Sequence, residues 1–384
     1  MALQENIVSN KIVYIVFRTD ASLQIGTGHV MRCLTLAEEL NDTGAQCRFI
    51  CREHSGNLIE LIRQRGFFVS VLPLPVEGFL SAEEHVETNT NYSAWLGATL
   101  DADAEQSKFE IGETTVDWLI VDHYALNARW ERMLRPLCRQ LMVIDDLANR
   151  EHDCDLLLDQ NFYWDHAQRY QGLLPKKCQT LLGPSYVLLR PEFKKARLGL
   201  RARDGIVKRI VIFFGGSDPS DQTSIVLSTL VKMNIPGVQV DVVVGHTNPN
   251  RRKIKLECSK IEFVTYHCNV SNMADLIVNA DLGIGAGGSA MWERCYLGLP
   301  TITVVSAENQ LRTTEDVAQL GAIEYLGFSK FLREIDYECA ISSLICNPQR
   351  LMQMSAAAFS IFNDQLTTSI VNAMQNSLHT WSYK

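Results

Sequence analysis

The stretch IVYIVFRTDASLQIGTGHVMRC, residues 12–33, decides the fold class of this chain. Its first six residues, 12–17, are all apolar, which is typical of a strand buried on both faces of a parallel sheet. A loop with two glycines follows, and from Val30 the apolar residues recur at helical spacing until Gly44 predicts the end of the helix. The stretch therefore predicts a β-loop-α unit, and residues 47–50 predict the next strand.

The same alternation continues through the first half of the chain. The expected elements are a helix at 58–65, strands at 68–72 and 118–121, a helix at 129–139 and a strand at 141–144. Residues 75–115 are polar and acidic, so we expect a helix-bearing surface excursion there. Strands that alternate with helices predict a doubly wound α/β domain.

A second α/β series begins at IVIFFGGSDPSD, residues 210–221. Its expected elements are strands at 210–214, 238–244, 281–285 and 302–305 and helices at 222–233 and 290–297. The predicted organisation is a Rossmann-like domain at 1–189, a basic linker at 190–209, a second Rossmann-like domain at 210–346 and a helical segment at 347–384 that packs back. Two such sheets in series predict a ligand cleft between the domains, at the carboxyl ends of their strands.

Composition narrows the classes of partner. The formal net charge is -8, whereas nucleic acid and anionic membranes attract basic surfaces. Residues 1–10 lack the apolar core of a signal peptide, and no stretch reaches the roughly 18 apolar residues of a spanning helix. We expect a cytoplasmic monomer that binds a small molecule, with no nucleic-acid partner and no membrane span.

The 11 cysteines are scattered singly, which predicts reduced core thiols and not a disulfide framework. The closest pair, Cys47 and Cys51, has no second cluster of Cys or His at ligand spacing. We therefore expect neither an essential metal nor a cofactor.

The loop before the first helix carries the first candidate site. Gly26 and Gly28 allow a ligand to approach the backbone, and His29 falls at the helix start. A helix N-terminus disfavours an imidazolium, so His29 is expected to be neutral, as a general base must be. The alternative is that His29 only caps the helix and the glycines form a turn.

The second candidate site follows the strand at 118–121. Asp122, His123 and Tyr124 come where that strand ends, and Tyr124 could hydrogen-bond a sugar or a water molecule. The alternative is that Asp122 is an ordinary N-cap and Tyr124 a core residue.

Two glycine-rich loops of the second domain suit phosphate groups. Gly215, Gly216 and Ser217 follow its first strand, although Asp218 could simply cap a tight turn there. Gly288 and Ser289 precede a helix that carries Glu293 one turn in. From this position its carboxylate could accept hydrogen bonds from ribose hydroxyls.

The residues around Gly288 also admit another interpretation. Gly283, Gly285 and Gly288 fit the spacing GxGxxG, and Glu308 lies 20 residues further on, as in a dinucleotide fingerprint. No residue pattern in the sequence indicates a hydride-accepting site, however, and phosphate-binding features occur in both domains. Both observations argue against a dinucleotide-binding enzyme. Asn309 and Gln310 then offer amides suited to sugar hydroxyls and acetamido groups, unless they are merely solvated.

Six segments together resemble one known family: RTDASLQIGTGHVMRC, DHY, IDDLANREHDCDLLLDQN, LLGPSYVLLRPEF, FFGGSDPSD and GGSAMWERCYLGLP. They resemble the UDP-sugar hydrolases of pseudaminic acid biosynthesis over roughly residues 11–327. More loosely, the chain is similar to the peptidoglycan N-acetylglucosaminyltransferases. Both likenesses imply the glycosyltransferase-B arrangement of two Rossmann-like domains, with the active site in the cleft.

The resemblance also implies roles for individual residues. His29 and Tyr124, the tyrosine of the DHY motif, would be the catalytic residues, and Glu293 the ribose ligand. The implied sugar-binding set is Asp20, Gly26, Gly28, Arg32, His123, Arg190, Asn309 and Gln310, and the implied UDP-binding set is Gly215, Gly216, Ser217, Val270, Gly288, Ser289 and Glu293.

The activity implied by the resemblance is hydrolysis of UDP-2,4-diacetamido-2,4,6-trideoxy-β-L-altropyranose to UDP and the free sugar, with inversion and without a metal. The excursion at 76–115 and the segment after Asn347 depart from the smallest members of the family. The alternatives are therefore a glycosyltransferase or hydrolase that acts on a related UDP-diacetamido sugar for surface polysaccharide, and a nucleotide-sugar-binding protein without turnover.

Overall fold

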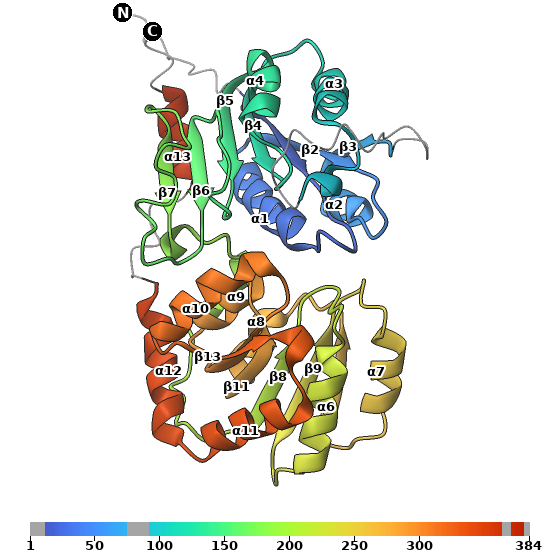
Figure 1. Ribbon diagram of the computed structural model, residues 1–384, viewed down its shortest axis with the longest axis vertical. Coiled ribbons are helices and arrows are strands. Elements are labelled where there is room, and N and C mark those ends of the chain that lie inside the picture. The colour runs from blue at the N-terminus through green and yellow to red at the C-terminus, as the bar shows by residue number, and fades with distance from the viewer. Residues whose placement is uncertain (1–11, 75–91, 363–369, 380–384) are drawn as a thin grey trace, which may run out of the picture.

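The computed structural model describes residues 12–74, 92–362 and 370–379. Within these ranges the chain forms two α/β domains that lie end to end (Figure 1). Each domain is built on one parallel sheet, of 7 and 6 strands respectively. The prediction of two Rossmann-like domains is therefore confirmed.

The first sheet has the order β3-β2-β1-β4-β5-β6-β7. Its strands are β1 (Tyr14–Thr19), β2 (Gln46–Arg52), β3 (Phe68–Leu72), β4 (Val116–Asp122), β5 (Cys138–Ile144), β6 (Leu156–Asp159) and β7 (Gln179–Leu182). Its helices are α1 (Gly28–Asp42), α2 (Ile59–Gln64), α3 (Leu100–Ile111) and α4 (Ala128–Leu134), with short 3-10 turns at η2 (Ser93–Leu96), η3 (Arg135–Leu137) and η4 (Pro184–Tyr186). The strand order reverses between β1 and β4, which is where open sheets bind ligands.

The second sheet has the order β10-β9-β8-β11-β12-β13 and reverses between β8 and β11. Its strands are β8 (Arg209–Phe213), β9 (Gln239–Val244), β10 (Val264–Cys268), β11 (Leu282–Ala286), β12 (Thr301–Val305) and β13 (Ile323–Phe328). The accompanying helices are α5 (Pro191–Arg197), α6 (Gln222–Met233), α7 (Arg251–Cys258), α8 (Met273–Asn279), α9 (Ser289–Tyr296), α10 (Leu311–Gln319), α11 (Glu334–Ile345) and α12 (Pro348–Ser360), with turns η5 (Glu308–Gln310) and η6 (Ser329–Phe331).

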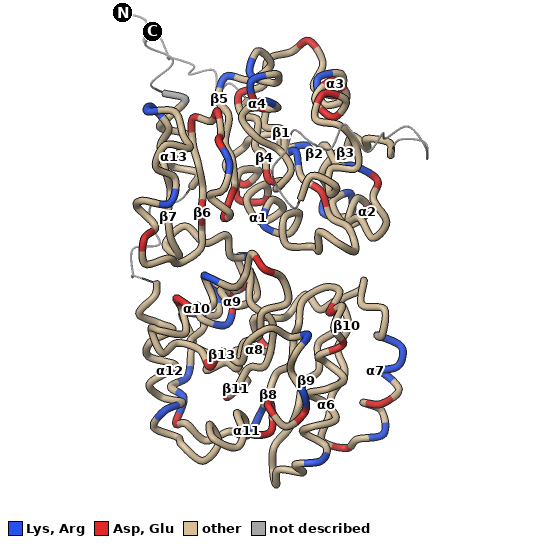
Figure 2. The backbone as a smooth tube through the Cα atoms, in the orientation of Figure 1, with Lys and Arg blue, Asp and Glu red and all other residues tan. Residues whose placement is uncertain are grey.

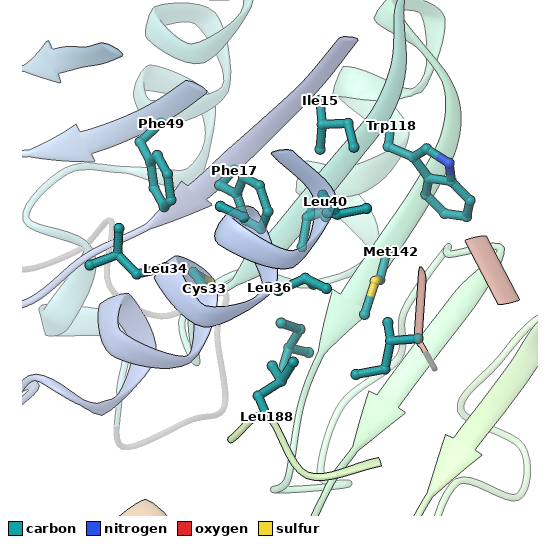
Figure 3. Packing of buried hydrophobic residues seen from close by; sticks show 14 of the residues in the cluster. Ile15, Phe17, Cys33, Leu34, Leu36, Leu40, Phe49, Trp118, Met142 and Leu188 are labelled. Atoms are coloured by element: carbon teal, nitrogen blue, oxygen red, sulfur yellow. The ribbon is translucent and has the colours of Figure 1, made fainter. Parts of the chain in front are cut away.

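The apolar periodicity of residues 12–40 is used as predicted. The buried face of α1 packs on β1, with Cys33, Leu36 and Leu40 next to Phe17 and Ile15 (Figure 3). Because α1 is fixed to the sheet along this face, its first turn is held at the carboxyl end of β1. That placement positions His29.

Helix α4 is shorter than the sequence predicts. It ends at Leu134 and gives way to η3, whose first turn contains a proline, Pro136. Proline has no N–H to donate to the preceding turn. Strand β5 consequently begins at Cys138, inside the range expected to be helical.

Residues 190–209 contain a helix, α5, that the sequence did not predict. Phe193 is fully buried in the same hydrophobic cluster as Trp292 of the second domain, and Arg203 donates hydrogen bonds to the carbonyls of Ala280 and Leu297. Weak periodicity here reflects a segment that is anchored by one aromatic ring and by side-chain-to-backbone bonds.

The final helix, α13 (Ile370–His379), lies beside β6 and β7 of the first domain (Figure 1). Val371 and Met374 are buried in the same cluster as Met142 and Leu156. Helix α12 instead packs on the second domain, where Ser355 donates to the carbonyl of Gly298 at 2.6 Å. The C-terminal segment thus contacts both domains.

All 11 cysteines are free thiols, but Cys268, Cys339 and Cys346 are exposed, so the expectation of core thiols is wrong for these three. Acidic and basic residues are interspersed over both domains (Figure 2). Part of the acidic excursion, residues 75–91, and the N-terminal residues 1–11 lie outside the described residues. Among the helices that are described, none combines the length and apolar character needed to cross a membrane.

Candidate active site

The first turn of α1 and the end of β4 together form a histidine–carboxylate pair. His29 Nδ1 lies 2.6 Å from Asp122 Oδ1, and Thr19 and Asp122 are register partners at the ends of β1 and β4. A carboxylate can only accept a hydrogen bond, so the proton of the neutral ring is on Nδ1. The other nitrogen, Nε2, keeps its lone pair.

Arg32 holds the carboxylate of this pair in place. Its Nε and Nη2 donate to the two oxygens of Asp122 at 2.6 and 2.7 Å. Burial disfavours the charge on Asp122, but Arg32 and then His29 override it and hold the pKa of the carboxyl well below its usual range. Asp122 is therefore a fixed anion behind the imidazole.

The same arginine connects His29 to Tyr124 through a second carboxylate. Arg32 Nη1 donates to Asp146 Oδ2 at 3.1 Å, and the Tyr124 hydroxyl donates to Asp146 Oδ1. Burial, and next the charge of Asp146, raise the pKa of Tyr124 well above its usual value. Tyr124 is therefore a neutral hydroxyl, and its ring meets that of His29 edge-on at 4.5 Å.

The second domain reaches this group through η5. Asn309 Nδ2 donates to the Tyr124 hydroxyl at 3.0 Å, so an expected sugar-binding residue of the second domain directly contacts an expected catalytic residue of the first. Gln310 has a different position: its side-chain oxygen accepts from the Ser306 N–H at 3.0 Å, and its amide lies over Gly288.

The glycine loops of the two domains face each other beside His29. A Cβ atom on Gly28 would lie 3.8 Å from Ser289 Oγ, and one on Gly216 would lie 2.9 Å from Thr27 Oγ1. Gly215 and Gly288 have φ of +87° and +74°, a region that favours glycine. The loops expected to hold phosphate thus come within van der Waals reach of the turn that carries the histidine.

Asp218 settles one alternative in the second domain. Its carboxylate accepts hydrogen bonds from the N–H groups of Gln222 and Thr223 at 3.0 and 2.9 Å. Asp218 therefore acts as a cap at the start of α6, which was the alternative to a phosphate-binding role for this loop. Those N–H groups are used by the protein. Any phosphate ligand must rely on Gly215–Ser217 and on the first turn of α9, whose leading N–H groups have no partner within a helix.

Glu293 lies one turn into α9 and is paired with Arg190 at 3.0 Å. Burial raises the pKa of Glu293, and Arg190 opposes that effect. Trp292, the residue before it, donates to Asn161 of the first domain at 2.8 Å. Arg190 and Glu293, both expected at the site, therefore meet each other next to an interdomain contact.

Three other expected residues have largely structural surroundings. Asp20 is fully buried, with Oδ1 accepting from the Arg52 N–H at 2.6 Å and lying 2.8 Å from Arg18. His123 accepts from the Ala125 N–H at 3.1 Å, and burial lowers its pKa to about 3. Val270, in the loop after β10, packs against the cluster around Trp292.

The dinucleotide interpretation does not fit the backbone. Gly283 and Gly285 lie inside β11, where added Cβ atoms would meet Thr301 Oγ1 at 2.9 Å and the Phe213 carbonyl at 2.1 Å. They are required by close strand packing and do not form the phosphate turn that the fingerprint demands. Only Gly288 occupies the loop.

Two residues of the site were not selected from the sequence, Asp122 and Asp146. Asp122 was weighed as an N-cap, but Asn127 caps α4 by accepting from Arg129 and Trp130. The signal for both was their position at the carboxyl end of a buried strand. In the described part of the chain, no group of three or more His, Cys, Asp or Glu side chains is arranged to hold a metal ion.

The second domain is similar to a known domain family. Residues 210–369 match the glycosyltransferase family 28 C-terminal domain. The glycine loops at Gly216 and Gly288, and Glu293, lie within the residues that match this domain.

The resemblance inferred from the sequence motifs is confirmed. Over 320 residues the chain is 27% identical to the UDP-2,4-diacetamido-2,4,6-trideoxy-beta-L-altropyranose hydrolase of Campylobacter jejuni subsp. jejuni, a match that covers 81% of this chain and 98% of that protein. The spore coat polysaccharide biosynthesis protein SpsG of Bacillus subtilis is 27% identical over 151 residues, 39% of this chain and 44% of its own length.

Solved structures show the same architecture. MurG of Acinetobacter baumannii superimposes with a TM-score of 0.61 at 13% identity, over 95% of this chain and 99% of that one. Arabidopsis thaliana UGT89C1, solved with UDP-L-rhamnose, gives 0.64 at 12% identity, over 96% and 99%. Together with the family 28 domain, these likenesses establish the glycosyltransferase-B fold.

Proposed function

We propose that this protein is an enzyme that acts on a UDP-sugar, and that it hydrolyses UDP-2,4-diacetamido-2,4,6-trideoxy-β-L-altropyranose to UDP and 2,4-diacetamido-2,4,6-trideoxy-L-altropyranose. The Campylobacter jejuni relative supports this proposal because the match spans nearly its whole length. The reaction would belong to pseudaminic acid biosynthesis.

The observation that carries the proposal is the His29–Asp122 pair at the cleft, 2.6 Å apart. With its Nδ1 proton held by Asp122, His29 has Nε2 available to take a proton from water. The water oxygen forms the new bond to C1 on the face opposite the nucleotide, and the C1–O bond to UDP breaks with its electron pair leaving on UDP. Asp122 stabilises the imidazolium that forms, and the sugar is released with inverted configuration.

In this proposal the second domain holds the nucleotide. The first turn of α9 at Gly288 and Ser289, together with Gly215–Ser217, offers N–H groups to the diphosphate as its charge develops. Glu293 accepts hydrogen bonds from the ribose hydroxyls, and Val270 lies near the uracil. A nucleoside diphosphate leaves as a stable anion, so the reaction needs no carboxylic acid partner of the kind a glycosidase uses.

Tyr124 and Asn309 complete the sugar end of the site. The Tyr124 hydroxyl donates to Asp146 and accepts from Asn309, so it positions groups and does not act as a base. The Asn309 amide retains its carbonyl oxygen for a hydroxyl or an acetamido N–H of the sugar.

The decisive experiment follows UDP and free-sugar release by NMR, with EDTA present, for the wild-type protein and two variants. We expect His29→Ala to lower kcat by about a hundredfold or more, the scale of a lost general base, with UDP affinity within a few-fold. His166→Ala, which changes an exposed histidine in the loop after β6, is the matched control and should be fully active. Wild-type rates in the His29 variant would exclude His29 as the base.

The second candidate is a transferase that delivers the sugar to an acceptor. The TM-scores to glycosyltransferases favour this possibility at the level of fold alone. The same NMR experiment separates the two, because a hydrolase yields equal amounts of UDP and free sugar without any acceptor.

A further inference from the structure

The excursion before β4 brings two aromatic residues to the catalytic group. Turn η2 (Ser93–Leu96) is anchored by Leu96, which is buried in a cluster with Val16, Leu72 and Trp130. It ends at Gly97, whose φ is +64° and whose Cβ, if present, would lie 2.7 Å from His54 Cε1. The turn is thus seated firmly on the first domain.

From this turn, Tyr92 and Trp95 extend onto Tyr124. The Trp95 and Tyr124 rings are stacked, with centroids 5.8 Å apart and planes at 24°. Tyr92 contacts both of them, at 4.6 Å from Trp95 and 5.1 Å from Tyr124. Because His29 meets Tyr124 at 4.5 Å, an aromatic wall runs from the imidazole to Trp95.

Exposure differs along this wall. Tyr124 is only 3% exposed, whereas Tyr92 and Trp95 each keep part of their surface accessible. Tyr92 also lies near charges from both domains: burial raises its pKa, and Glu308 of η5 and Asp146 add to that effect. Tyr92 therefore lies near η5, the turn of the second domain whose Asn309 contacts Tyr124.

The chemistry of such a wall differs from that of the rest of the site. The glycine loops, Arg190 and Glu293 offer hydrogen bonds and charge, as a diphosphate and a ribose require. Aromatic faces instead bind C–H bonds and methyl groups.

We propose that Tyr92 and Trp95 form the binding surface for the apolar face of the sugar, and that they select a deoxygenated diacetamido sugar over a more hydroxylated one such as N-acetylglucosamine. This inference rests on the proposed function and adds to it the residues that determine specificity. A 2,4,6-trideoxy sugar with two acetamido groups carries three methyl groups, which the accessible aromatic surface of Tyr92 and Trp95 can desolvate.

The test combines saturation-transfer NMR with kinetics on Trp95→Ala, Trp95→Phe and Tyr92→Phe. The probes are the UDP-diacetamido sugar and UDP-N-acetylglucosamine, and the ribose H1′ signal is the internal reference. In Trp95→Ala we expect saturation of the sugar methyl protons to fall by about half or more relative to H1′, and KM to rise about tenfold, the scale of one lost aromatic contact. UDP affinity should be unchanged, and Trp95→Phe should retain most of the methyl signal.

The control is Phe109→Ala, which removes an aromatic ring that is 84% exposed on α3 and should alter neither readout. The inference is overturned if Trp95→Ala leaves the methyl saturation at the wild-type level, or if the wild-type protein saturates no sugar methyl group. Methyl saturation without release of UDP would instead contradict the proposed hydrolysis and leave the aromatic wall supported. The two proposals therefore fail separately.

Discussion

Replacing Asp122 by asparagine tests the electrostatic core of the site. Asp122 accepts three charge-assisted contacts, from His29 Nδ1, Arg32 Nε and Arg32 Nη2, at 2.6, 2.6 and 2.7 Å. Asparagine has almost the same shape but only one acceptor oxygen. Whichever way the amide turns, its NH₂ group must face a donor on His29 or on Arg32.

The expected magnitude follows from these contacts. If the NH₂ group faces His29, the ring proton moves to Nε2, and the base is lost. If it faces Arg32, the imidazolium formed in the reaction loses its anionic partner. Either outcome lowers kcat by about 10²–10⁴. Asp122 is fully buried, so breaking its pair with Arg32 also lowers the free energy of unfolding by about 3–5 kcal/mol.

The assay is UDP release at saturating substrate, together with the dissociation constant of UDP from calorimetry and a urea unfolding curve. The matched control is Asp117→Asn at the other end of β4, where the carboxylate accepts from the Tyr14 N–H at 3.0 Å. That variant should lose stability and keep its kcat. A folded Asp122→Asn protein with a kcat like that of the wild type would refute the assigned role of the histidine–carboxylate pair.

Three further predictions concern binding, pH dependence and folding. Glu293→Gln should weaken UDP binding about tenfold, because a charged acceptor for the ribose is lost, and an unchanged dissociation constant in calorimetry would remove Glu293 from the nucleotide site. Burial raises the pKa of Asp159 to about 8. Between the ordinary aspartate pKa and about pH 8, the folded state therefore keeps a proton that the unfolded chain releases. The free energy of unfolding consequently falls as pH rises through this range. Asp159→Asn should remove this pH-dependent loss of unfolding free energy, which amounts to up to about 1.4 kcal/mol per pH unit. The prediction is contradicted if urea unfolding at several pH values gives the same loss in the variant and in the wild-type protein. Met374→Ala on α13 should cost about 2–5 kcal/mol by leaving a cavity against the first domain, and an unchanged Tm in calorimetry would contradict that packing.

The fold was predictable because its signal is local. The six apolar residues at 12–17 and the helical spacing after Val30 each determine one element, and the alternation of such elements leaves few topologies. The helix start at His29 and the loops at Gly216 and Gly288 were found for the same reason. Failures occurred where one residue overrides a pattern, as Pro136 does in ending α4, or where a single ring such as Phe193 anchors a helix.

The pairings within the site were not predictable in this way. Asp122 lies 93 residues from His29, and Asn309 lies 185 residues from Tyr124; no local pattern encodes such contacts. Periodicity and glycine chemistry act between near neighbours, so the two parallel sheets and the residues at their strand ends could be derived from the order of amino acids alone. Which of those residues meet depends on the folded chain, because a buried charge such as that of Asp122 needs partners that lie far away in sequence and come close only on folding.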